Sequence, residues 1–159
     1  MAIEQELESA PPITADRTDW GFHWEVDREV RLVDTDATGM VHFAAYVRMM
    51  EEAEYAFLRD RGLSVVLRDE RGTLGFPRLS ANMDIVQPVT YGETIRVQVR
   101  LAQLDAKSVE YQFRLVDFSG TTRVRGEFRA ACCRFPDQGP PYAILIPESV
   151  AAALADFNP

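Results

Sequence analysis

The sequence has few cysteines and no pattern of metal ligands. Only two cysteines occur in the chain of 159 residues, Cys132 and Cys133, and they are adjacent. Neighbouring residues in a strand point to opposite faces, so we do not expect these two thiols to pair with each other. No CxxC pair or Cys/His set has the spacing of zinc ligands. We therefore interpret both cysteines as small buried residues and expect no metal and no cofactor.

Long apolar runs and an excess of positive charge are also missing. No apolar run approaches the 18 residues of a transmembrane helix. The net charge is -8 and the pI is about 4.8, which disfavours nucleic acid and anionic membranes as partners. The start of the chain has neither the basic residues nor the apolar core of a secretory signal. We expect a cytoplasmic protein.

The length suits one domain, with a short extension in front of it. A domain of this size buries roughly 70% of the surface of its extended chain. Residues 1–19 carry five acidic residues and one arginine, contain Pro11-Pro12 and show little periodicity. These features predict a flexible acidic arm over residues 1–19. We expect a single folded domain over residues 20–159.

The clearest periodic segment predicts a long helix over residues 42–61. Its apolar residues recur at helical spacing and form one wide face, while charged residues occupy the other face. Gly62 follows as a suitable C-cap. A helix of that length extends roughly 30 Å. The apolar positions are Phe43, Tyr46, Val47, Met50, Ala53, Phe57 and Leu58.

Most of the remaining chain alternates as strands do. Asp117 to Gly120 has the composition of a hairpin turn, and Pro147 is suited to open a short helix over 148–155. Consecutive strands with short connections usually pair as antiparallel neighbours. A single amphipathic helix must bury its apolar face on that sheet, so we expect an α+β domain, an antiparallel sheet wrapped around one long central helix. The predicted strands are 26–33, 78–86, 95–102, 109–115 and 123–135, with an uncertain connection at 63–76.

The polar break between the first strand and the long helix is the candidate site. It runs from Asp34 to Gly39, with His42 close behind. Asp and Thr are common helix caps and Gly is a common turn residue, which is the structural interpretation. A carboxylate ahead of a helix also faces backbone N–H groups that have no intrahelical partner and can bind an oxyanion. It can then attack a thioester carbonyl or activate a water. Both interpretations fit the residues.

The same residues carry a resemblance. The segment Val33-Asp34-Thr35-Asp36-Ala37-Thr38-Gly39-Met40-Val41-His42-Phe43-Ala44-Ala45-Tyr46, followed by Glu51-Glu52-Ala53 and Leu58-Arg59, resembles the signature of the 4-hydroxybenzoyl-CoA thioesterase family. Pro88-x-x-Tyr91-Gly92-Glu93 is similar to a later turn of that family. The resemblance covers about residues 25–135. It implies a hotdog fold and hydrolysis of an acyl-CoA thioester to a free acid and coenzyme A.

The resemblance also assigns roles within the motif. It implies that Asp36 is the catalytic carboxylate, as nucleophile or general base, and that Asp34 is structural. Gly39 matches the turn glycine. The backbone amide of Phe43 matches the donor that polarises the thioester carbonyl. Tyr46 matches the motif tyrosine, which packs in the core or beside the substrate pocket.

Further expectations follow for substrate and assembly. Family members pair into dimers by continuing the sheet, often into tetramers, so we expect a homodimer or homotetramer with active sites at the dimer interface. Lys107 and Ser108 match a stretch that contacts the coenzyme A phosphates, although only one basic residue is kept. Phe76 and Pro77 are expected to line the acyl pocket. An acyl group on a carrier protein is an alternative substrate.

Other sites and functions stay open. His42 stands where many relatives have tyrosine, and it is a candidate to touch substrate, tune Asp36 or merely pack. Glu54 is a secondary candidate, because another branch of hotdog thioesterases uses a helix carboxylate, although the H-G-G stretch of that branch is absent. A hydratase or dehydratase would use Asp36 and His42 as acid and base, but its D-x-N-P-x-H motif is missing. A non-catalytic acyl-binding protein is the alternative of a different class.

Overall fold

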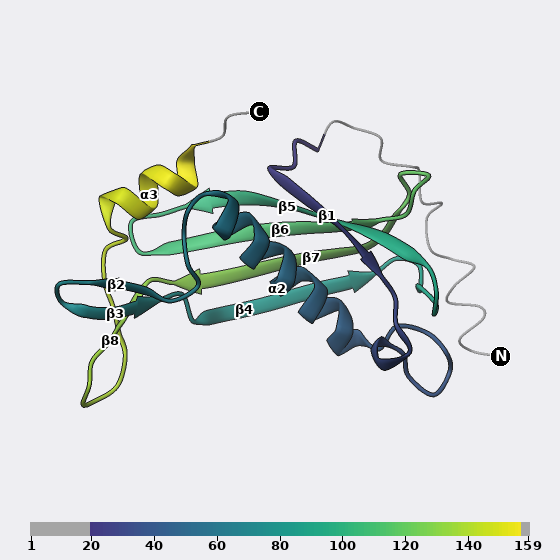
Figure 1. Ribbon diagram of the computed structural model, residues 1–159, viewed down its shortest axis with the longest axis horizontal. Helices are drawn as coiled ribbons and strands as arrows, with labels where there is room; N and C mark the ends of the chain where they lie inside the picture. The colour runs from purple at the N-terminus through teal and green to yellow at the C-terminus, as the bar shows by residue number, and fades with distance from the viewer. Residues whose placement is uncertain (1–19, 157–159) are drawn as a thin grey trace.

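A computed structural model describes residues 20–156 of the chain (Figure 1). The predicted arm at residues 1–19 lies outside the described residues. A five-stranded main sheet and a smaller four-stranded sheet are formed within the described range. The elements in chain order are β1 (Trp24–Glu29), η1 (Leu32–Asp34), α2 (Phe43–Asp60), β2 (Leu67–Asp69), β3 (Gly72–Gly75), β4 (Arg78–Ile85), β5 (Thr94–Leu104), β6 (Ser108–Val116), β7 (Thr122–Ala131), β8 (Cys133–Phe135), β9 (Tyr142–Ala143) and α3 (Glu148–Ala155).

The main sheet is antiparallel and has the strand order β1-β5-β6-β7-β4. Its inner strands follow the predicted alternation, with every second side chain of β5 and β6 buried. The predicted hairpin turn joins β6 to β7, and the Asp117 carboxylate accepts hydrogen bonds from the amides of Ser119 and Thr121. Figure 1 shows α2 lying across the face of this sheet. The predicted architecture, a sheet wrapped around one long helix, is confirmed.

The core lies between α2 and the inner face of the main sheet. The helix buries most of the stripe predicted from its periodicity, including Tyr46, Met50, Ala53 and Phe57. Phe43, predicted to belong to the stripe, is exposed at the first position of the helix. It approaches the sheet closely at Gly126 on β7, where an added Cβ would lie 2.1 Å from the sulfur of Met50. A glycine at this position leaves room for the methionine side chain.

The predicted first strand is shorter than expected, because β1 ends at Glu29. The Asp34 carboxylate accepts a hydrogen bond from the amide of Arg31 at 2.9 Å, and the chain turns into the short helix η1. This local side-chain bond competes with continued strand pairing. Leu32 and Val33, expected within the strand, are therefore exposed.

The last predicted strand is divided into β7 and β8 at Cys132. The amide of Cys132 donates to the carbonyl of Lys107, and its own carbonyl accepts from Ile144. The following residues join the smaller sheet, whose order is β2-β3-β8-β9 and which also fills part of the uncertain connection 63–76. Both cysteines are buried and unpaired, as expected.

The order of the strands differs from the prediction at one place. Strands β4 and β5 follow each other in the sequence but are not neighbours, since β4 pairs with β7 and β5 pairs with β1. The connection over residues 86–93 therefore crosses from one side of the sheet to the other. It passes the N-terminal end of α2, where Val41 donates to the carbonyl of Val89. Within residues 20–156, no helix is both long and apolar enough to span a membrane.

Candidate active site

The loop before α2 is a closed turn that presents Asp36. The amide of Asp36 donates to the carbonyl of Met40 at 2.8 Å, and the amide of Gly39 donates back to Asp36 at 3.1 Å. Gly39 has a φ of 79°, a conformation that glycine adopts without strain. Thr35 and Val41 form an isolated antiparallel bridge at the base of the turn. The loop is therefore fixed at both ends.

The carboxylate of Asp36 is exposed and held by Thr38. Its Oδ1 atom accepts hydrogen bonds from the Thr38 hydroxyl at 2.5 Å and from the Thr38 amide at 2.8 Å. These two bonds, the hydroxyl first, lower the pKa of Asp36. Both bonds end on Oδ1, so they fix the orientation of the group, and no residue within 20–156 donates a hydrogen bond to Oδ2. The structure supplies an ionised, oriented carboxylate beside a helix start.

The N-terminal end of α2 lies immediately beyond this loop. His42 is the N-cap, and its Nδ1 accepts a hydrogen bond from the amide of Ala44 at 3.1 Å. Its own amide donates to the carbonyl of Asp34, which is buried. Phe43 is the first helical residue, so its N–H has no intrahelical acceptor. The ring of Phe43 is exposed and lies 4.5 Å from the ring of His42, measured between centroids.

Tyr46 points into the core below the same end of the helix. Its side chain is 1% exposed, and its hydroxyl accepts a hydrogen bond from the amide of Val89 at 3.0 Å. The carbonyl of Val89 in turn accepts from Val41. Tyr46 thus supports the segment around Val89, against which the Asp36 loop packs. The side chain was expected either in the core or beside the substrate pocket, and it lies in the core.

Glu54 lies towards the other end of α2 and is buried. Both of its carboxylate oxygens accept hydrogen bonds from the guanidinium of Arg78 on β4, with Nη1 to Oε1 at 3.0 Å. The guanidinium also stacks on the ring of Phe128, 4.3 Å from its centroid. Burial raises the pKa of Glu54, and the hydrogen bond from Arg78 opposes that rise. This buried ion pair joins the helix to an edge strand.

Phe76 and Pro77 line a cavity of about 230 Å³ beside that ion pair. Lys107 and Ser108 lie at the same end of the sheet as this cavity. The amide of residue 131 donates to the carbonyl of Pro77, and the next amide, of residue 132, donates to the carbonyl of Lys107. Lys107 is exposed in the turn between β5 and β6. The hydroxyl of Ser108 donates to the carboxylate of Asp105 at 3.3 Å.

The predicted site residues therefore fall into two groups within one chain. One group lies at the N-terminal end of α2 and consists of Asp36, Gly39, His42 and Phe43, with Tyr46 in the core below it. The second group lies towards the C-terminal end of α2 and consists of Glu54, Phe76, Pro77, Lys107 and Ser108. The helix has 18 residues, which corresponds to about 27 Å. Sequence reasoning does not identify Thr38 and Arg78 as partners of the two carboxylates. Thr38 follows Asp36 by two residues, so the contact between them could have been found from the local sequence. Arg78 is 24 residues from Glu54, and no local pattern in the sequence points to their contact.

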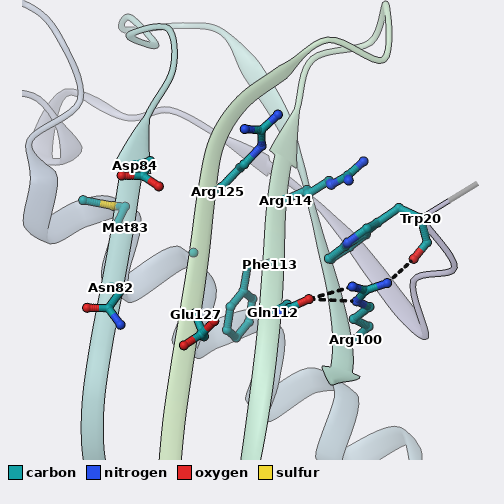
Figure 2. A pocket seen from close by; sticks show the side chains of 11 residues that line it. Trp20, Asn82, Met83, Asp84, Arg100, Gln112, Phe113, Arg114, Arg125 and Glu127 are labelled. Atoms are coloured by element: carbon teal, nitrogen blue, oxygen red, sulfur yellow. Dashed lines mark hydrogen bonds between the residues drawn. The ribbon is translucent and has the colours of Figure 1, made fainter. Parts of the chain in front are cut away.

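A wider groove of about 370 Å³ lies on the outer face of the main sheet and contains none of these residues. Figure 2 shows Trp20 beside Arg100 and Arg114, whose guanidinium carbons each lie 4.8 Å from the indole centroid. Arg125 and Glu127 follow on β7, with charges of opposite sign. Across residues 20–156, no three His, Cys, Asp or Glu side chains are grouped as metal ligands.

An antiparallel sheet wrapped around one long helix is the architecture of hotdog-fold proteins, and solved structures show the same arrangement. A hypothetical protein from Thermus thermophilus superposes with a TM-score of 0.71 at 28% identity, covering 85% of this chain and 99% of that chain. A 1,4-dihydroxy-2-naphthoyl-CoA thioesterase from Synechocystis gives a TM-score of 0.72 at 21% identity, covering 84% of this chain and 96% of that one. The predicted hotdog fold is confirmed.

The sequence matches the model of the thioesterase-like superfamily over residues 30–154. The chain therefore belongs to that superfamily. A 1,4-dihydroxy-2-naphthoyl-CoA hydrolase from Crocosphaera subtropica is 27% identical over 89 residues, which cover 56% of this chain and 65% of that protein. The chain thus spans somewhat less than two thirds of the length of that relative.

Proposed function

We propose that the protein is an acyl-CoA thioesterase of the 4-hydroxybenzoyl-CoA thioesterase type, with Asp36 as its catalytic carboxylate. The observation that carries the proposal is the position of Asp36, oriented by Thr38 beside the first amides of α2. Membership of the superfamily and relatives that are named CoA hydrolases support it. An exposed carboxylate with a lowered pKa is ionised at neutral pH, as the chemistry requires.

The reaction follows from the charges at the end of the helix. The thioester carbonyl oxygen accepts from the Phe43 amide, and the positive end of the helix dipole stabilises the negative charge that develops there. Asp36 either attacks the carbonyl carbon through Oδ2 or removes a proton from an attacking water. The first route expels the thiolate and leaves an anhydride that water hydrolyses. The second yields the acid directly, and both release coenzyme A.

We further propose that the active unit is a homodimer in which two β4 strands pair across a two-fold axis. Strand β4 is an edge of the main sheet, and an edge strand has unpaired backbone groups. It exposes 59% of Leu79 and 47% of Ile85. Antiparallel pairing about the middle of β4 places the partner's Arg78 opposite Ile85. The partner's cavity then lies towards the Asp36 loop, so the two separated groups of candidate residues form one site.

Lys107 and Ser108 belong to this proposal as contacts for the phosphates of coenzyme A. They lie at the same end of the sheet as the cavity, so the two-fold axis brings them towards Asp36 of the other protomer. The turn offers one lysine, with Asp105 beside it. We therefore expect the phosphates to contribute little to affinity, and a carrier-protein thioester to be a substrate worth including in any assay.

Hydrolysis of aliphatic and aromatic acyl-CoA thioesters, followed by detection of free thiol, tests the activity. We expect Asp36→Asn to reduce kcat by about 10² to 10⁴, the usual contribution of a positioned carboxylate. Glu52→Gln, which changes an exposed carboxylate on the polar side of α2, should keep wild-type rates. Equal rates for Asp36→Asn and the wild type would refute the proposed role of Asp36.

Mixed dimers test the shared site. Val65 lines the cavity, and Val65→Trp should fill it and stop turnover. A heterodimer of Asp36→Asn and Val65→Trp protomers has one site that combines an intact Asp36 with an intact cavity. Mixing the two inactive proteins should therefore restore activity. If each protomer held a complete site of its own, the mixture would stay inactive.

A further inference from the structure

The connection over residues 86–93 is the segment against which the Asp36 loop lies. Residues 39–41 run antiparallel to residues 89–91, with one isolated bridge and two backbone hydrogen bonds, of 2.8 and 3.4 Å. The amide of Asp36 donates to the carbonyl of Met40, which lies inside that pairing. The position of the Asp36 carboxylate therefore depends on where the connection lies.

Backbone hydrogen bonds fix the two ends of this connection. At one end, the amides of residues 86 and 87 both donate to the carbonyl of Arg123 on β7, at 2.9 and 3.0 Å. At the other end, residues 92 and 93 exchange hydrogen bonds with Val30, at 3.0 and 2.8 Å. The middle of the connection is the part that meets the Asp36 loop, and side chains hold it in place.

The side chain of Arg123 ties this middle part together. Its Nη1 donates to the carboxylate of Glu93 at 3.0 Å, and its Nη2 donates to the carbonyl of Pro88. The other carboxylate oxygen of Glu93 accepts hydrogen bonds from the amide and the hydroxyl of Thr90, at 2.7 and 2.8 Å. The Arg123 side chain is 14% exposed, so solvent screens these bonds only in part. One guanidinium thus binds the first and the last residue of the segment Pro88-x-x-Tyr91-Gly92-Glu93.

The two acceptors call for the forked shape of an arginine. The two terminal nitrogens of Arg123 bind different groups, and Nη1 also lies 3.5 Å from the carboxylate of Asp117. The Nε atom is buried and has no hydrogen-bond partner among residues 20–156. A lysine would supply a charge without that unsatisfied donor, but it carries one compact ammonium group in place of a planar fork. What arginine alone supplies here is the simultaneous contact with Glu93 and with the carbonyl of Pro88.

We propose that Arg123 is a positioning residue for the reaction. It holds the connection over residues 86–93, and the connection sets the spacing between the carboxylate of Asp36 and the amide of Phe43. The ionisation of Asp36 has a separate cause, because the hydrogen bonds that lower its pKa come mainly from Thr38 within the loop. Arg123 therefore affects the rate of the chemical step and not the protonation of the carboxylate. This inference rests on the proposed function, which assigns the two groups whose spacing is set.

Steady-state kinetics of Arg123→Lys test the proposal. A displacement of about 1 Å caused by a distant substitution can cost about 10² in rate. We expect kcat and kcat/KM of this variant to fall together by about 10 to 10², the pattern of an interaction that is made in the transition state. KM and the acid limb of the rate profile should stay at wild-type values, because the substrate contacts and the Thr38 hydrogen bonds are kept.

Arg134→Lys is the matched control. The Arg134 side chain is 8% exposed, and it likewise donates to a carboxylate, that of Asp69, and to a backbone carbonyl, that of Gly72. These contacts lie in the smaller sheet and hold no part of the Asp36 loop. With rates referred to the folded protein measured by circular dichroism, we expect this variant to lose stability and keep the wild-type kcat. An equal loss of kcat in both variants would overturn the proposal, because it would show that Arg123 acts only through stability.

Nuclear magnetic resonance of the backbone amides follows the Asp36 loop without turnover. In Arg123→Lys the amides of Asp36 and of residues 39–41 should change their chemical shifts and exchange their hydrogens faster, while Arg134→Lys should leave them unchanged. If the wild type hydrolyses no thioester, the proposed function fails, and this measurement still decides whether Arg123 positions the loop.

Unchanged loop amides in Arg123→Lys, a kcat equal to that of an active wild type, or a displaced acid limb would each overturn the proposal. Should this variant not fold, Glu93→Gln takes its place. Glu93→Gln keeps the size of the side chain and removes the charge that Arg123 binds. It should show the same changes in kcat and in the loop amides, to a smaller degree.

Discussion

Replacing Tyr46 by phenylalanine isolates one buried hydrogen bond that supports the candidate site. The substitution removes only the hydroxyl oxygen that accepts the amide of Val89 at 3.0 Å. Val89 is 1% exposed, so its N–H would be left buried without its acceptor. An unsatisfied buried donor costs about 1–3 kcal/mol. In a chain of this size each kcal/mol lowers Tm by roughly 2–4 °C, so a loss of about 2 kcal/mol corresponds to a fall of about 4–8 °C.

Thermal and urea unfolding of the variant, read by circular dichroism, measures this loss. Tyr91→Phe is the matched control, because Tyr91 lies two residues from Val89 but is exposed, and we expect a change within about 0.5 kcal/mol. The Val89 amide should also exchange its hydrogen faster in Tyr46→Phe. An unchanged Tm together with a raised KM would refute the reasoning, because it would show that the hydroxyl binds substrate instead of supporting the fold.

Two further predictions concern the loop and the sheet. Thr38→Val removes the hydroxyl that holds the pKa of Asp36 below its usual range, so that pKa should rise and the acid limb of the rate profile should move to higher pH. Thr35→Val should leave that limb in place, because the Thr35 hydroxyl donates to Leu32. Gly126→Ala should destabilise the fold by about 1–3 kcal/mol in urea unfolding, because the new Cβ would overlap the buried sulfur of Met50. Wild-type stability in that variant would show that the methionine has room to move.

The long helix was readable from the sequence to within one residue at each end. Its apolar residues repeat at helical spacing over five turns, and a repeat of that length and period is typical of an amphipathic helix. Gly62 marks the C-terminal boundary by local chemistry, whereas the N-cap is His42, whose role as a cap was not predicted from the sequence. The inner strands were equally clear, because half-buried strands alternate with a period of two. Asp36 was selected from a motif of neighbouring residues, and its role stays a prediction.

Pairing between distant segments was not readable in the same way. Strand β4 lies at the sheet edge because it pairs only with β7 in the order β1-β5-β6-β7-β4. That pairing depends on distant strands, and the local pattern of β4 does not predict it. The sequence identified Glu54 as a secondary candidate but could not predict that it would be buried as a charge. Burial of a carboxylate requires a partner, and Arg78 comes from another element.

The sequence by itself thus determined the elements whose causes are local: the helix, the alternating strands, the hairpin turn and the loop that carries Asp36. Periodicity, caps and turn residues act over a few positions, so each can be read in isolation. Only the tertiary structure decided that Asp36 and the cavity beside Glu54 lie towards opposite ends of α2. The length of a rigid helix separates them in one chain, and that separation is the physical reason to expect that two copies form each site.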